Sequence, residues 1–212
     1  MTEGNAWIPG RKRRDCPLSK LKLILNKITE EKFLPLSLEI RTFFEERIVT
    51  EADMRGCAES ILEKAMKEPH YAALYTQLCI YLTEQRTTFK PILLKTLQTI
   101  FQDIVESALS TRTKRLVGCV AVISEFYNLN MLPSEILFRD VMSRLLFEES
   151  DSSIEALCIV LTRVWDKVLL HFKTRTSLKM YIQRLSTLQK DENADISSRI
   201  RFLLLDVLEK EH

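Results

Sequence analysis

Residues 23–33, with the sequence LILNKITEEKF, contain the end of one apolar helix pattern and the start of another. Apolar residues recur around the first half of this segment at spacings of three and four, which line one side of a helix: Leu21, Ile24, Leu25 and Ile28. Thr29 offers a hydroxyl that can cap the next helix, with the carboxylates of Glu30 and Glu31 at the positive end of its dipole. The pattern predicts two antiparallel helices with almost no loop between them, in which Thr29 is the N-cap and Phe33 the first apolar anchor.

The rest of the chain repeats this plan of apolar helices joined by short connections. Thr50 with Asp53, and Ser152 with Glu155, have the spacing of capping boxes at helix starts. Further helices are expected over residues 50–68, 71–85, 90–105, 116–126, 134–146, 152–169, 175–189 and 195–210, which makes about ten in all.

Three features refine the helix pattern. Gly118 lies inside an almost wholly apolar segment, where we expect it to permit a close contact between helices. Pro35 lies inside the second helix pattern, where the loss of a backbone hydrogen bond is expected to kink the helix. Residues 110–113, Ser-Thr-Arg-Thr, are expected to form the short linker between the fifth and sixth helices.

The composition predicts an all-α chain. Of the 212 residues, 46% are hydrophobic, which is enough for a substantial core, but only four glycines and six prolines occur. A β-sandwich or barrel would need a turn signal every ~8–12 residues. Helix pairs that recur about every 40 residues are typical of a HEAT-type solenoid, here of about five antiparallel pairs. A compact helical bundle has similar spacing and is the alternative.

Positive charge is concentrated near the N-terminal end. The formal net charge is only +2, yet the first 27 residues contain seven basic and two acidic side chains. We expect residues 1–16 to form a flexible basic arm ahead of a domain over residues 17–212. Trp7 in this arm either folds back onto the domain or is held for a partner. A contact to RNA phosphates is one interpretation of the basic run, with a solvated tail or a nuclear import signal as alternatives: Arg11, Lys12, Arg13 and Arg14.

The sequence contains no recognisable catalytic or metal-binding pattern. The five cysteines lack Cys-x-x-Cys spacing, which argues against a disulfide framework or a zinc site and favours a reducing compartment. Gly56 and Gly118 lie in helical patterns and build no phosphate-binding loop, while His70 and His171 are isolated. Apolar runs fall short of the ~20 residues that cross a bilayer. We expect a soluble monomer that is not an enzyme and needs neither cofactor nor metal.

Five blocks of the chain, in the same order, resemble the middle domain of eukaryotic translation initiation factor 4 gamma. Together they span about Trp7 to Lys210. The blocks are Ile24-Leu25-Asn26-Lys27-Ile28-Thr29 with Phe33; Glu63-Lys64-Ala65 with Glu68-Pro69 and residues 71–79; Ile123-Ser124-Glu125-Phe126-Tyr127 with Met131-Leu132; Ser153-Ile154-Glu155-Ala156-Leu157-Cys158 with Leu161-Thr162; and Ser197-Ser198-Arg199-Ile200-Arg201-Phe202 with Asp206-Val207-Leu208.

The resemblance implies a five-repeat HEAT domain that scaffolds translation initiation. In that family the domain binds a DEAD-box RNA helicase, initiation factor 4 alpha, stimulates its ATPase by holding both lobes, and contacts RNA. Helicase-contact positions of the family match Leu25, Ile28 and Phe33, and a Trp ahead of the domain matches Trp7. The last helix, with Arg199, Arg201 and Phe202, is where the second helicase lobe would be met.

Alternatives to these contacts follow from the residues themselves. Leu25 and Ile28 fall on the apolar side of a helix, so they can instead be core residues. Arg199 and Arg201 can instead pair with acidic residues of the preceding repeat.

The resemblance also implies a cytoplasmic protein, with other initiation factors as further partners. The alternative is a nuclear scaffold of mRNA processing or decay that binds a different DEAD-box helicase. The sequence lacks a Tyr-x-x-x-x-Leu segment followed by a large apolar residue, so recruitment of the cap-binding protein is not expected.

Overall fold

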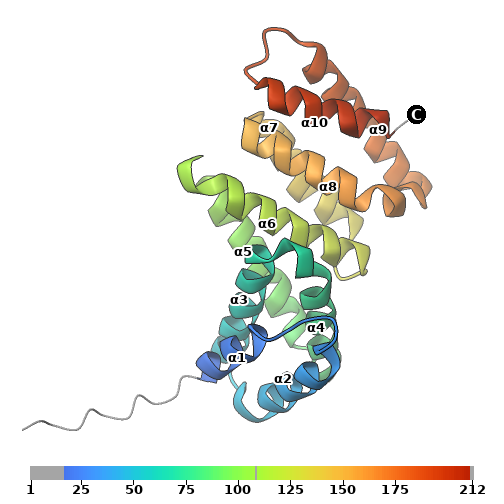
Figure 1. The fold of residues 1–212 in the computed structure, drawn as a ribbon. Coiled ribbons are helices and arrows are strands. Elements are labelled where there is room, and N and C mark those ends of the chain that lie inside the picture. Colours follow the sequence, from blue (N-terminus) through green and yellow to red (C-terminus); the bar gives the residue numbers. More distant parts are fainter. Residues whose placement is uncertain (1–16, 108, 211–212) are drawn as a thin grey trace, which may run out of the picture.

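Helices stacked in successive pairs make up the protein, as a computed structural model of residues 17–107 and 109–210 shows (Figure 1). The α-helices are α1 (Pro17–Leu25), α2 (Phe33–Arg47), α3 (Glu51–Lys67), α4 (Ala72–Gln85), α5 (Phe89–Glu106), α6 (Leu109–Asn128), α7 (Ser143–Glu148), α8 (Asp151–Leu169), α9 (Phe172–Lys190) and α10 (Ser198–Glu209). A 3₁₀ helix, Pro69–Tyr71, precedes α4, and a π-helix, Ile136–Met142, leads into α7. No strand occurs within the described ranges.

Consecutive helices form five antiparallel pairs that stack in chain order. The pairs are α1 with α2, α3 with α4, α5 with α6, the π-helix and α7 with α8, and α9 with α10. The second helices of the pairs form one layer, in which α2, α4, α6, α8 and α10 follow one another. Helix contacts join members of the same pair or of neighbouring pairs, as in a solenoid. The prediction of an all-α HEAT-type solenoid, rather than a bundle, is confirmed.

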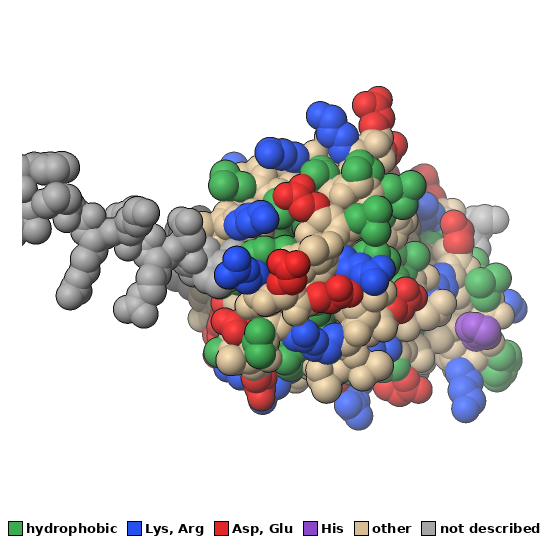
Figure 2. Space-filling view, turned by 90° about the horizontal axis from the view of Figure 1, so that it is seen from below, with side chains coloured by type: hydrophobic (Ala, Val, Ile, Leu, Met, Phe, Trp, Pro, Cys, Tyr) green, Lys and Arg blue, Asp and Glu red, His purple; other side chains and the backbone are tan. Residues whose placement is uncertain are grey.

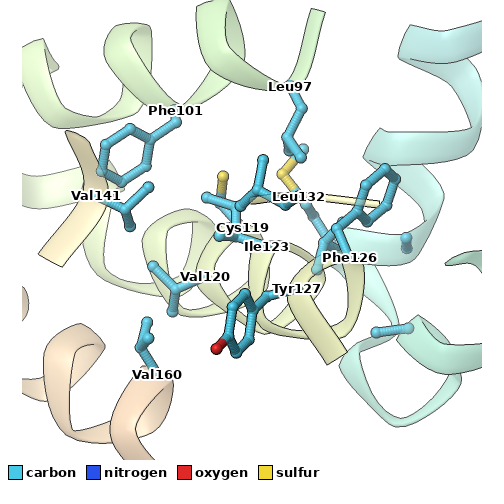
Figure 3. Packing of buried hydrophobic residues seen from close by; sticks show 14 of the residues in the cluster. Leu97, Phe101, Cys119, Val120, Ile123, Phe126, Tyr127, Leu132, Val141 and Val160 are labelled. Carbon is cyan, nitrogen blue, oxygen red and sulfur yellow. The ribbon is translucent and has the colours of Figure 1, made fainter. Parts of the chain in front are cut away.

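The core of the stack is organised around α6, which packs on helices of three different pairs. Its side chains Val120 and Ile123 lie between Phe101 of α5 on one side and Val160 of α8 on another, all of them buried (Figure 3). An apolar surface on nearly all sides is therefore the expected composition for this helix.

Gly118 brings α6 against the backbone of α3. A Cβ atom added at Gly118 would lie 2.1 Å from the carbonyl oxygen of Met66 and 2.9 Å from its carbonyl carbon. No side chain fits at these distances, so the predicted close contact at Gly118 is confirmed.

Of the two predicted capping boxes, one is confirmed and one is wrong. The amide of Asp53 donates to the Thr50 hydroxyl over 3.1 Å, and the Asp53 carboxylate accepts from the Thr50 amide over 3.0 Å. Ser152 is not the cap, because the N-cap of α8 lies two residues earlier than predicted. Ser150 is the N-cap, and its hydroxyl accepts from the amide of Ser153 over 3.3 Å.

Thr29 does not cap α2, contrary to the prediction from sequence. Residues 29–32 form a turn in which the Lys32 amide donates to the Thr29 carbonyl over 3.1 Å, so Lys32 takes the N-cap position and the connection is longer than expected. Pro35 then lies in the first turn of α2, where amides have no intrahelical acceptor. The predicted loss of a hydrogen bond therefore does not occur.

The predicted linker over residues 110–113 is also wrong. These residues have helical backbone conformation inside α6, which begins at Leu109.

Gly118→Ala is expected to destabilise the fold by about 1–3 kcal/mol, because the new methyl group meets rigid backbone. Gly56→Ala is the matched control. Its Cβ would lie 2.7 Å from Leu18 Cδ1, at the end of a side chain that can rotate away, and alanine favours the helix over glycine. Urea unfolding of both variants measures the difference. Equal stability of the two would contradict the close contact.

Candidate functional site

The connection between α1 and α2 is built on buried side chains. Leu25 is 1% exposed and Ile28 is 5% exposed, so the structure places both in the hydrophobic core. The Tyr75 hydroxyl of α4 lies 3.4 Å from the Leu25 carbonyl and donates to the Glu68 carboxylate over 2.8 Å. The second helix pair thus supports this connection. Of the two interpretations from sequence, the core position applies to Leu25 and Ile28.

Exposed leucines lie on α2, the helix that follows this connection. Phe33 is half-buried, whereas Leu34 is 75% exposed and Leu38, one turn later on the same side, is 55% exposed. We call Phe33, Leu34 and Leu38 the α2 patch. Figure 2 shows the end of the molecule that carries α1 and α2, where hydrophobic side chains are interspersed with basic and acidic ones. An apolar patch with a charged surround is typical of a protein interface.

The α2 patch was only partly found from sequence, which named Phe33 alone. Leu34 and Leu38 lie out of phase with the side chains of α2 that face the core, such as Ile40 and Phe44. That phase difference is the signal that would have found them.

On α10, the three residues predicted to meet a helicase have different environments. Arg199 forms an ion pair with Glu155 of α8, with nitrogen–oxygen distances of 2.5 and 3.0 Å, and this carboxylate raises the pKa of Arg199. Arg201 donates to the carbonyl of Gln189 at the end of α9 over 2.9 Å. Phe202 is 68% exposed and points away from the core. Only Phe202 of the three is thus free of such contacts, and Arg199 pairs with the preceding repeat as the alternative from sequence states.

The remaining predicted residues lie outside the part of the chain that the structure describes. They are Trp7, Arg11, Lys12, Arg13 and Arg14. Their roles stay predictions.

An open groove of about 540 Å³ lies between α5, α6 and the π-helix. Its walls are largely apolar, with Lys95, Asp140 and Arg144 among the polar lining residues.

Burial raises the pKa of Cys57 and of Cys119 to about 12, so both thiols stay protonated at neutral pH. Within the described ranges, acidic, histidine and cysteine side chains form no cluster that would hold a metal ion. The helices among those residues are also too short or too polar to span a bilayer.

Comparison with known proteins identifies relatives along almost the whole chain. The family model of the MIF4G domain matches residues 18–211. Eukaryotic translation initiation factor 4 gamma 2 of Homo sapiens is 27% identical over 95% of this chain, and factor 4 gamma 3 of Mus musculus is 26% identical over 97%. The chain spans 26% and 16% of the lengths of these two relatives. This chain therefore belongs to the MIF4G domain family, as the resemblance to the middle domain of initiation factor 4 gamma predicted.

Proposed function

We propose that this chain is a scaffold of translation initiation that binds and stimulates the DEAD-box RNA helicase initiation factor 4 alpha and contacts RNA. Three findings support the proposal: the family is one of scaffold-type domains, the relatives are named as translation initiation factors, and the stack carries exposed apolar side chains at both ends. The observation that carries it is the α2 patch, because it follows directly on the segment that resembles the helicase-binding part of the family.

The mechanism is positioning rather than chemistry by this chain. The exposed α2 patch lies in the first helix pair and the exposed Phe202 in the last. These two pairs are at opposite ends of the stack (Figure 1). Two lobes of a helicase that dock at these two places would be held at a separation set by the packed helices between them. Leu25 and Ile28 then act indirectly, by fixing the start of α2, and Arg201 acts by fixing α10 against the end of α9.

In this proposal, Trp7 docks on the helicase, Arg11–Arg14 contact RNA phosphates, and the protein works in the cytoplasm as a monomer with other initiation factors. The basic run also favours a second candidate, a nuclear scaffold that binds a different DEAD-box helicase and uses Arg11–Arg14 as an import signal. Calorimetric titration with initiation factor 4 alpha distinguishes the two. Binding together with stimulated ATPase activity is the expected result, and absence of binding would overturn the first candidate.

Leu34→Glu is expected to weaken helicase binding at least about tenfold, as for an interface residue worth more than about 1.4 kcal/mol. Its melting temperature should stay unchanged because the side chain is 75% exposed. Val49→Glu is the control, since Val49 is 69% exposed but follows the other end of α2. Equal affinities of the two variants in the titration would remove the α2 patch from the interface.

Leu25→Ala is expected to lower the free energy of unfolding by about 2–5 kcal/mol, because it deletes a buried side chain. The fraction that remains folded should bind the helicase with affinity close to that of the wild type. Denaturation and titration at a temperature where the variant is folded measure the two effects. A loss of affinity without a loss of stability would restore Leu25 as a direct contact.

Trp7→Ala is expected to weaken helicase binding without a change in melting temperature, because Trp7 precedes the predicted core. Titration and thermal unfolding of the full chain measure both quantities. Lower thermal stability with binding intact would show that Trp7 belongs to the fold instead.

A further inference from the structure

The groove between α5, α6 and the π-helix arises because the two layers of the stack are packed unequally. In the layer of second helices, α6 packs directly on α8, and in the layer of first helices, α3 packs directly on α5. The backbone of α5 approaches that of the π-helix and of α7 much less closely. The layer of first helices is therefore open between the third and fourth pairs, and this opening is the groove of about 540 Å³.

Two parallel rows of side chains on α5 form one wall of the groove. The inner row is apolar and has the spacing of three and four that marks one side of a helix: Leu94, Leu97, Phe101 and Val105. The outer row has the same spacing but is polar and exposed: Lys95, Gln98, Gln102 and Glu106. Figure 3 shows Phe101 beside Val141 of the π-helix, which belongs to the opposite wall. An apolar floor with a polar rim is typical of a groove that receives the apolar side of a helix.

The charged residues of the rim differ in whether the protein already pairs them. Asp140 and Arg144 have ion-pair partners within the π-helix and within α7, respectively. Lys95 and Glu106 form no ion pair with any residue that the structure describes, and both are exposed. They lie on the same side of α5, about 16 Å apart along the helix axis. The rim thus offers a free cation towards one end and a free carboxylate towards the other.

The opposite wall is fixed by a contact from the last helix pair. The Tyr181 hydroxyl of α9 donates to the Phe138 carbonyl of the π-helix over 2.6 Å, and the Ser143 hydroxyl donates to the same carbonyl over 3.0 Å. A π-helix is rare and is found frequently at functional sites. Because this wall is held in place before any partner arrives, binding would cost little ordering of the groove.

We propose that the groove binds an amphipathic helix of a partner protein, which inserts large apolar side chains between α5 and the π-helix. An acidic residue of that helix lies near Lys95 and a basic residue near Glu106. A helix satisfies its own backbone groups, whereas an extended segment would need hydrogen bonds that the apolar inner row does not supply. This site lies beyond the proposed function, in which the helicase contacts are on α2 and α10.

The lining of the groove disfavours two other classes of occupant. Its charged residues are two basic and two acidic ones, so it has no net charge to attract a polyanion such as a nucleic acid: Lys95, Arg144, Glu106 and Asp140. Its volume is in the range of small-molecule sites, but such sites bury most of the ligand surface, whereas this groove is open along its rim. A helix that lies on the rim uses both the apolar floor and the two free charges.

Selection from a displayed library of random peptides, with the full chain as bait and no helicase present, tests the proposal. The peptides have about 16 residues, enough for about four turns of helix. Enriched sequences are expected to have large apolar residues at spacings of three and four, with an acidic and a basic residue about eleven positions apart. Enrichment of sequences without this pattern would overturn the proposal, and so would the absence of any enrichment.

Lys95→Glu/Glu106→Lys is expected to weaken binding of a fluorescein-labelled selected peptide about tenfold in an anisotropy titration, because each end of the peptide then meets a like charge. A peptide with its acidic and basic residues exchanged should recover the affinity. The matched control is Lys90→Glu/Asp103→Lys, which reverses the same charges at exposed positions of α5 outside the groove and should have no effect. Equal losses in the two variants, or no recovery with the exchanged peptide, would overturn the proposal.

Leu94→Gln is expected to weaken peptide binding at least about tenfold, because it places an amide in the apolar row. Ile100→Gln is the control for any loss of stability, since Ile100 is also half-buried on α5 but does not line the groove. Equal affinities of the two variants would place the peptide elsewhere. A dimer of the full chain in sedimentation that dissociates in Leu94→Gln alone would assign the groove to a second copy instead. Because no helicase is present, these results do not depend on the proposed helicase contact.

Discussion

The approach of α6 to the Met66 carbonyl at Gly118 is the contact on which the centre of the stack depends. It joins the second and third helix pairs at a distance that excludes any side chain at position 118, so a larger residue there would force α3 and α6 apart. The same helix buries Val120 and Ile123 against its other neighbours. The position of the N-terminal half of the stack relative to the C-terminal half is therefore set by rigid packing and not by a linker.

At three places along the stack, a basic side chain donates to a backbone carbonyl at the end of a helix. Arg86, after α4, donates to the Ile48 carbonyl at the end of α2 and lies 5.1 Å from the Phe44 ring centroid. Lys167 of α8 donates to the Asn128 carbonyl at the end of α6 over 2.8 Å, and burial lowers the pKa of this lysine. Arg201 of α10 does the same for α9. In each case a cation meets the negative end of a helix dipole, which both satisfies carbonyl groups and fixes neighbouring helices against each other.

Periodicity was enough to predict the helices and their antiparallel pairing, because burial of one apolar side is what each helix contributes to the stack. It favoured a solenoid but left a compact bundle open, and the family resemblance added the five-repeat HEAT domain. Periodicity was not enough where several residues could perform the same task. Ser150 and Ser152 both offer a capping hydroxyl, and the choice between them depends on how α7 leads into α8. The helical phase of Leu34 places it away from the core side of α2, but its exposure also requires that no other helix covers it, which holds among the described elements and is not encoded in the phase. The contact surfaces were thus the least predictable part.

The exposed apolar side chains of α2 and α10 lie in the first and last helix pairs of the described chain, each of which packs on a neighbouring pair on one side only. Interior helices such as α6 are covered by helices of adjacent pairs, whereas α2 and α9 have no further pair beyond them in the described chain. The α2 patch belongs to the first helix pair and the exposed Phe202 to the last, and these two pairs lie at opposite ends of the stack (Figure 1). In the proposed function, the two lobes of one helicase would therefore dock on different side chains and would not compete with each other. The packed core between them then fixes the separation at which the scaffold presents one to the other.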